Sequence, residues 1–216
     1  MGEITLIRHG QANSAATDED SYDQLSETGH QQAKWLGQYL RAQGEKYDSV
    51  LTGTLSRHIS TVESMGAMGV DVQIDARLNE MDYFNLGRAL KETHGVPMPE
   101  PAQFATHITQ VMEAWHRAEI MGNETFADFE ARVISVLSEA TQPGKHVLCI
   151  TSGGVIGMIV RNLLHLDPTR LAHVLLPIRN TSIHRIHVIE QGPILGGFNA
   201  TPHLDAPERL YARTNF

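Results

Sequence analysis

The chain has 216 residues, of which 41% are hydrophobic and 19% are charged, so it is long enough for a packed domain and too apolar for extended disorder. The net charge of −8 argues against a nucleic-acid partner or an anionic membrane surface. The single cysteine, Cys149, excludes an intramolecular disulfide, as suits a reducing compartment. The longest apolar stretch, 147–164, is interrupted by Arg161 and a Ser-Gly-Gly triplet, so it predicts no membrane span. We therefore expect a cytoplasmic protein.

Strand and helix patterns alternate along the chain. Strands are predicted at about 3–8, 49–52, 72–74, 146–151 and 182–189. Helices are predicted from Ser26 to near Gly44 and at about 54–68, 104–119, 125–140 and 152–164. This alternation predicts an α/β fold with three layers, a mostly parallel open sheet carrying helices on both faces.

Two segments lack a clear pattern. Residues 78–100 contain several glycines and prolines and are expected to form an inserted loop. Together with the helices after it, this loop predicts a lid-like insert at about 78–125 within a single domain, 1–216. The last stretch, 192–216, is expected to wrap back over the core.

The first predicted strand ends at Arg8, His9 and Gly10. Ligands of open α/β sheets bind outside the carboxyl ends of the strands. Arginine offers a planar fork of donors that suits phosphate, and a neutral imidazole beside it can act as a nucleophile. The motif therefore predicts a phosphoryl-transfer site in which His9 attacks phosphorus.

Other strand ends carry groups of the same chemistry. Arg57 follows the second strand, Glu80 follows the third, and Ser152 with Gly153 follows the fourth at the start of a helix. Alone, each has an ordinary reading: Arg57 as a surface ion pair, Glu80 as a solvated charge and Ser152 as a helix N-cap. Their joint placement after successive strands favours one anion-binding site.

These motifs, in this order, resemble the histidine phosphatase superfamily, whose fold is shared with the cofactor-dependent phosphoglycerate mutases. The resemblance is carried by residues 6–10, 56–63 and 78–80 and covers nearly the whole chain. It implies that His9 is phosphorylated, that Arg8 and Arg57 hold the phosphate, and that Glu80 protonates the leaving oxygen.

The chain departs from the family pattern at one position. Ser152 stands where the family usually has a second histidine, in a His-Gly-Gly sequence that here reads Ser-Gly-Gly. Ser152 keeps a hydroxyl donor and, with Gly153, the helix N-terminus, but it lacks the charge. Loss of one preorganised donor costs on the order of 10²–10³ in rate. Asn13 and His203 are further candidates, and His203 is the histidine considered as a replacement.

The sequence thus predicts a phosphomonoesterase that acts on a small-molecule phosphate ester and needs no metal or other cofactor. The serine substitution keeps a second hypothesis open, a phosphoryl-binding or regulatory protein with weak or no turnover. A phosphoglycerate mutase is less favoured, because the basic residues of segment 78–123 are only Arg88, Lys91 and Arg117. The substrate and a homodimeric state are left open.

Overall fold

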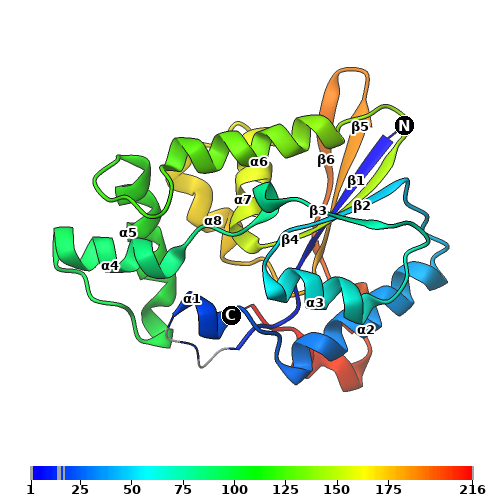
Figure 1. Cartoon of the computed structure of the whole chain (residues 1–216), viewed down its shortest axis with the longest axis horizontal. Coiled ribbons are helices and arrows are strands. Elements are labelled where there is room, and N and C mark those ends of the chain that lie inside the picture. Colours follow the sequence, from blue (N-terminus) through cyan, green and yellow to red (C-terminus); the bar gives the residue numbers. More distant parts are fainter. Residues whose placement is uncertain (1, 14–15, 17, 216) are drawn as a thin grey trace.

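The computed structural model describes residues 2–13, 16 and 18–215 (Figure 1). The described residues form a six-stranded sheet in the order β3-β2-β4-β1-β5-β6. The strands are β1 (Gly2–Arg8), β2 (Ser49–Thr52), β3 (Val72–Ile74), β4 (His146–Thr151), β5 (Ile183–Ile189) and β6 (Gly192–Ala200). Strands β3, β2, β4 and β1 are parallel, whereas β5 and β6 are antiparallel to their neighbours. The predicted mostly parallel α/β fold is confirmed.

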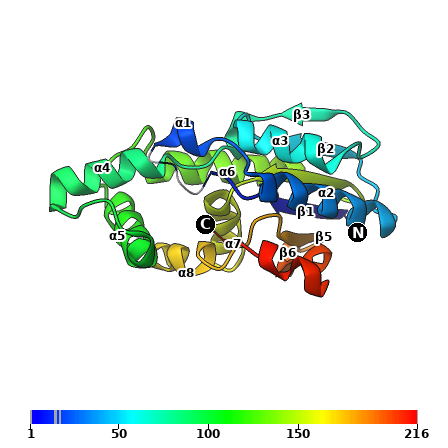
Figure 2. The ribbon, with the colours of Figure 1, turned by 90° about the horizontal axis from the view of Figure 1, so that it is seen from below.

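Helices cover both faces of the sheet (Figures 1 and 2). They are α1 (Glu19–Tyr22), α2 (Glu27–Ala42), α3 (Ser56–Met65), α4 (Tyr83–His94), α5 (Phe104–His116), α6 (Phe126–Ala140), α7 (Gly153–Leu163) and α8 (Leu171–Leu175). Side chains alternate along β4, so Leu148 and Ile150 pack with α2 and α3 in one core cluster. Val147 and Cys149 face the other cluster, which includes side chains of α4 to α8. The central strands therefore pack between two hydrophobic clusters, one on each face of the sheet.

Several helix ends lie where capping residues predict them. The Ser26 hydroxyl accepts the Gly29 N–H at the start of α2, and Thr125 forms a reciprocal capping box with Asp128 at the start of α6. Helix α3 is shorter than the predicted range of 54–68, because it ends before Gly66, whose φ is 78°.

The segment 78–100 differs from the prediction of an irregular loop, because it contains the 12-residue helix α4. The Asp82 carboxylate accepts the Asn85 N–H at its start, Gly95 ends it in the left-handed conformation, and Leu86 and Leu90 are buried one turn apart. Helices α4 and α5 extend beyond the strands in both views (Figures 1 and 2). That they act as a lid stays a prediction.

The C-terminal segment adds an edge strand that the sequence analysis did not predict. Residues 192–200 form β6, which pairs with β5 along most of its length, and the following short 3-10 turn Pro202–Leu204 packs against α2. Within the described ranges, none of the helices combines the length and the apolar character needed to cross a membrane.

Candidate active site

The predicted site residues meet at one edge of the sheet because three parallel strands end there in register. Arg8 at the end of β1 pairs with Thr151 of β4, and Thr52 of β2 pairs with Ile150. His9, Ser152 and the start of α3 therefore follow side by side. A cavity of about 370 Å³ opens at this edge, and its polar lining includes Arg8, Asn13, Glu19, Arg57, Glu80, Gly153 and Gly154.

The His9 imidazole lies buried at this edge with its tautomer fixed by the backbone. Its Nδ1 lies 2.7 Å from the Gly10 carbonyl oxygen. A carbonyl can only accept, so Nδ1 carries the proton and Nε2 keeps its lone pair. The ring lies edge-on to Tyr22, with centroids 6.5 Å apart. Burial, followed by the positive charges of Arg57 and Arg8, holds the pKa of His9 well below its ordinary value, so the ring is neutral and nucleophilic.

This environment makes a direct prediction about the His9 ring. In ¹⁵N-edited spectra recorded without phosphate or sulfate, its nitrogens should keep the chemical shifts of the Nδ1–H tautomer from pH 8 down to pH 5.5. The resonances are assigned by their absence in His9→Asn. A midpoint near 6.5, the value of an unperturbed histidine, would show that burial and the two arginines do not control this ring.

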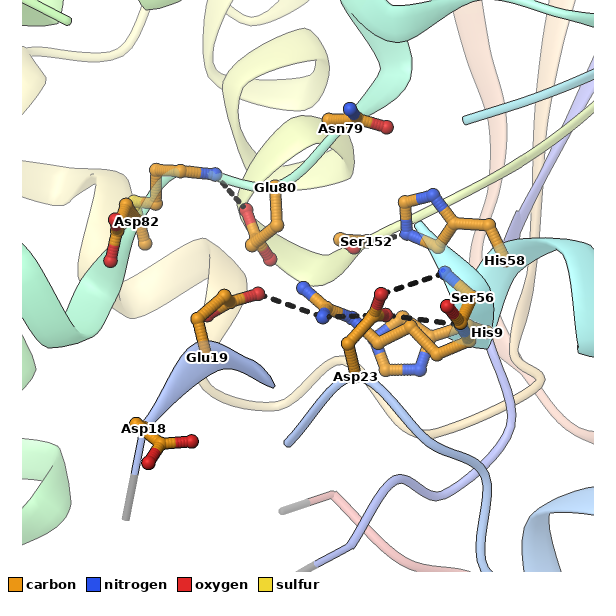
Figure 3. Close-up of polar contacts among 12 residues, drawn as sticks. His9, Asp18, Glu19, Asp23, Ser56, His58, Asn79, Glu80, Asp82 and Ser152 are labelled. Carbon is orange, nitrogen blue, oxygen red and sulfur yellow. Dashed lines mark hydrogen bonds and ion pairs between the residues drawn. The ribbon is translucent and has the colours of Figure 1, made fainter. Parts of the chain in front are cut away.

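The Arg57 guanidinium is completely buried, and only part of it is used by the protein. Its Nη1 donates to Glu19 at 2.8 Å and to Asp23 at 3.1 Å (Figure 3). Its Nε and Nη2 have no hydrogen-bond partner among the described residues. The Tyr22 ring stacks on the guanidinium at 4.9 Å. Buried donors without partners are costly, so the two unpartnered nitrogens of Arg57 mark a candidate site for an anion.

Arg8 repeats this pattern from the end of β1. Its Nη1 donates to the Ile178 carbonyl, whereas its Nε is buried without a partner in the described part of the chain. The Thr61 hydroxyl links the two arginine segments, because it accepts the Gly10 N–H and donates to the Arg57 carbonyl. Both arginines thus line one cavity, and both carry buried donors without a partner in the described part of the chain.

The N-terminus of α3 is occupied by a carboxylate of the chain itself. The Asp23 carboxylate accepts the N–H groups of Ser56 at 2.8 Å and Arg57 at 3.1 Å (Figure 3). The chain's own anion therefore occupies this helix end, and Arg57 contributes through its side chain alone.

Glu80 reaches the cavity from the segment that follows β3. Its Oε2 accepts the Gly154 N–H at 2.9 Å, and its Oε1 accepts the Met81 N–H at 3.1 Å. A Cβ on residue 154 would lie 2.2 Å from Oε1, so only glycine leaves room for this carboxyl. The arrangement holds a carboxyl group beside the first turn of α7.

The remaining candidates lie in different surroundings. Ser152 is buried beside the cavity, and its Oγ lies 2.6 Å from Nε2 of His58. Asn13 lines the cavity and donates to the Ser21 carbonyl. His203 lies outside the lining, where its Nε2 is 2.9 Å from the Thr181 hydroxyl and burial lowers its pKa to about 4. It supports the segment that binds the backbone of Arg8 and His9.

The sequence analysis missed His58, Tyr22 and Glu19. Tyr22 and Glu19 belong to the four-residue helix α1, which is too short to give a periodic signal. His58 follows Arg57 directly, and only the packing of α3 against β4 shows that its ring meets Ser152 and lies 5.6 Å from the His9 ring.

The far part of the cavity is apolar and aromatic. Tyr83 and Phe84 of α4 and Phe104 and Ile108 of α5 line it, with Met98 between the two helices. Among the described residues of the lining, the cationic side chains are those of Arg8 and Arg57. The cavity therefore joins a polar part, which contains both arginines, to an apolar chamber.

The chain is similar to known proteins over two thirds or more of its length. A family model described as the histidine phosphatase superfamily, branch 1, matches residues 4–201. A probable phosphoglycerate mutase GpmB from Citrobacter koseri is 26% identical over 96% of this chain and 97% of its own. A 2,3-bisphosphoglycerate-dependent phosphoglycerate mutase from Brucella ovis is 32% identical over 67% of this chain and 70% of its own.

Solved structures share the fold. Bacillus stearothermophilus YhfR superposes with a TM-score of 0.70 at 20% identity, covering 94% of this chain and 99% of its own. A phosphoserine phosphatase from Entamoeba histolytica, in complex with phosphoserine, superposes with a TM-score of 0.68 at 19% identity, covering 94% of this chain and all of its own.

Proposed function

Because the chain belongs to the histidine phosphatase superfamily, a family of phosphoryl-transfer enzymes, we propose that it is a phosphomonoesterase with His9 as nucleophile. One observation carries the proposal: a neutral imidazole with a free Nε2 lies beside two buried guanidinium groups that keep unpaired donors. A phosphoryl transition state spreads charge over its equatorial oxygens, and such donors stabilise that charge without reorganisation.

The reaction has two steps, transfer of the phosphoryl group to His9 and hydrolysis of the resulting phosphohistidine. In the first, Nε2 of His9 forms a bond to phosphorus as the bond to the ester oxygen breaks, and Glu80 gives its proton to the departing alkoxide. In the second, water attacks the phosphohistidine, the P–N bond breaks, and the Glu80 carboxylate takes a proton from the water. The phosphate oxygens are held by Arg8, Arg57 and the N–H of Gly153 at the start of α7.

Hydrolysis is favoured over mutase activity by the charge of the cavity. A mutase acting on phosphoglycerates must hold a second anionic group of the substrate, and this requires donors beyond the phosphate site. Here the described lining away from Arg8 and Arg57 is aromatic and aliphatic, and Glu19 adds a negative charge. A buried carboxylate or phosphate without partners is strongly unfavourable. The chamber therefore suits an ester whose leaving group is apolar or aromatic.

A comparison of substrates tests this assignment. We expect kcat/KM for phenyl phosphate to exceed that for 3-phosphoglycerate by about 10²-fold. The carboxylate of 3-phosphoglycerate would be an uncompensated anion in an apolar site, which costs several kcal/mol, and water at the mouth of the cavity would offset part of this cost. Phe104→Ala should narrow this difference by removing apolar contact. Equal rates for the two esters, or phosphoglycerate mutase activity dependent on 2,3-bisphosphoglycerate, would contradict the proposed substrate class.

A further inference from the structure

His58 and Ser152 form a buried side-chain pair next to the proposed nucleophile. Both are completely buried, and the His58 Nε2 lies 2.6 Å from the Ser152 Oγ (Figure 3). Ser152 joins β4 to α7 directly before Gly153 and Gly154, which line the cavity. The hydrogen bond between His58 and Ser152 can run in either direction. Its direction determines where the proton of the Ser152 hydroxyl points.

Ser152 is not used as a helix cap. It occupies the N-cap position of α7, yet its hydroxyl accepts no backbone N–H there. The N–H of Gly154, one of the groups that such a hydroxyl would accept, donates to Glu80 instead. The Ser152 hydroxyl instead shares a hydrogen bond with His58, and it can engage a second partner.

The tautomer of His58 follows from its other nitrogen. Nδ1 is buried and has no hydrogen-bond partner among the described residues. A buried N–H without an acceptor is rare in proteins, and its cost exceeds that of an idle lone pair. The proton therefore resides on Nε2, which donates to the Ser152 oxygen. That oxygen then directs its own hydrogen away from His58.

We propose, building on the function proposed above, that His58 and Ser152 act together as the donor that the usual second histidine supplies in this family. His58 Nε2–H donates to Ser152 Oγ, and the Ser152 O–H donates to a phosphoryl oxygen. Ser152 is the catalytic residue of the pair, because it touches the phosphoryl group, and His58 is a positioning residue that acts through it. No proton leaves either group.

The pair differs from a cationic histidine in one respect that the surroundings explain. Burial, followed by the positive charge of Arg57, holds the pKa of His58 well below its ordinary value, so the ring is neutral. A protonated His58 would add a third buried cation to Arg8 and Arg57, and burying it would be costly. A neutral pair of side chains provides a directed donor at lower cost.

Space around the ring gives the proposal its sharpest consequence. The His58 ring is held between two neighbours: its Nε2 lies 2.6 Å from the Ser152 Oγ, and a Cβ on Gly53 would lie 2.2 Å from its Nδ1. A histidine at position 152 would have to occupy volume that the His58 ring already fills. Ser152→His alone should therefore lower the rate, although it restores the family residue, and removal of the His58 ring should relieve that loss.

The test is a set of variants measured with phenyl phosphate. Ser152→Ala is expected to lower kcat by about 10²-fold, the usual effect of losing one such donor. His58→Leu should lower it about tenfold or more, as loss of an outer-shell partner does elsewhere. His58→Gln, whose amide can donate from the same place, should recover most of that loss. Ser152→Ala/His58→Leu should be no slower than Ser152→Ala, because His58 acts only through the hydroxyl.

Swapping the histidine between the two positions distinguishes the relay from a packing role. Ser152→His and His58→Ala should each be at least about tenfold slower than the wild type, and His58→Ala/Ser152→His should be faster than either. Additive losses in both double variants, or a fast Ser152→His enzyme, would overturn the proposal. Thermal unfolding of each variant separates loss of fold from loss of the donor.

A matched control comes from a second His–Ser pair on the surface. His30 Nδ1 lies 2.8 Å from Ser64 Oγ across α2 and α3, away from the cavity. His30→Leu and Ser64→Ala should leave kcat unchanged. Calorimetry with vanadate gives a readout that does not need turnover: Ser152→Ala and His58→Leu should each weaken binding about tenfold or more, as loss of a donor requires. Unchanged vanadate affinity in both variants would overturn the relay, whereas a wild type that binds vanadate without turnover would overturn only the proposed hydrolase.

Discussion

Replacing His9 with alanine is expected to abolish hydrolysis, with kcat for phenyl phosphate falling by about 10³-fold or more, because no other group can form the covalent intermediate. The substitution removes the ring that lies beside both arginines while leaving their partners in the protein in place. The measurement is phosphate release, combined with rapid-quench trapping of labelled enzyme after addition of a ³²P-labelled ester. The label on the wild type should be stable in base and released by acid, as a phosphoramidate bond requires.

The control for this experiment is His173→Ala, which removes an exposed histidine of α8. It should hydrolyse and trap label as the wild type does. Turnover that persists in His9→Ala would contradict the assignment of the nucleophile. A wild type that binds phosphate esters and neither turns over nor traps label would instead support the alternative of a phosphoryl-binding protein.

The features that can be predicted from the sequence are those that depend on residues close together in the chain. Arg8 and His9 were predicted as site residues because an apolar run with β-branched residues stops at them. Ligands of open α/β sheets bind at the carboxyl ends of the strands. The start of α6 was predicted because Thr125 and Asp128 satisfy each other's backbone donors within one turn. Such signals need no knowledge of the rest of the chain.

The features that were missed depend on contacts between distant segments. Asp23 was not expected at the start of α3, because nothing near residue 23 indicates that the loop before α2 approaches residues 56 and 57. His58 shares a hydrogen bond with a residue 94 positions away. Helix α4 was missed for another reason: the glycines and prolines around it outweighed its Asp82 and Gly95 caps.

The position of His203 shows why a sequence resemblance could not decide which histidine approaches Ser152. His203 lies near the C-terminus and packs against the turn at Thr181, with its ring 6.4 Å from Tyr39. His58 reaches Ser152 because α3 runs beside β4, which is a property of the sheet order rather than of either residue's neighbours in the chain. Donor placement at this site is therefore a tertiary property.

Glu80→Gln is expected to slow hydrolysis in proportion to how much the leaving group needs a proton. For 2-phenylethyl phosphate, whose leaving group is a strongly basic alkoxide, kcat should fall by about 10²–10⁴-fold, the usual contribution of a general acid. For p-nitrophenyl phosphate, of similar size and aromatic character, the leaving nitrophenolate is already a stable anion and the fall should be far smaller. Glutamine keeps an acceptor for one of the two N–H groups that Glu80 holds, so the first turn of α7 should stay in place.

Glu19→Gln provides the contrast. Glu19 is the second carboxyl group in the described lining of the cavity, and it accepts a hydrogen bond from Arg57. Its loss should change the rates of both esters by the same factor, because it acts on the charge of the phosphate site and not on the leaving oxygen. Equal losses for both esters in Glu80→Gln would remove Glu80 from proton transfer and leave it as a support for Gly154. A selective loss in Glu19→Gln would place the acid on α1 instead.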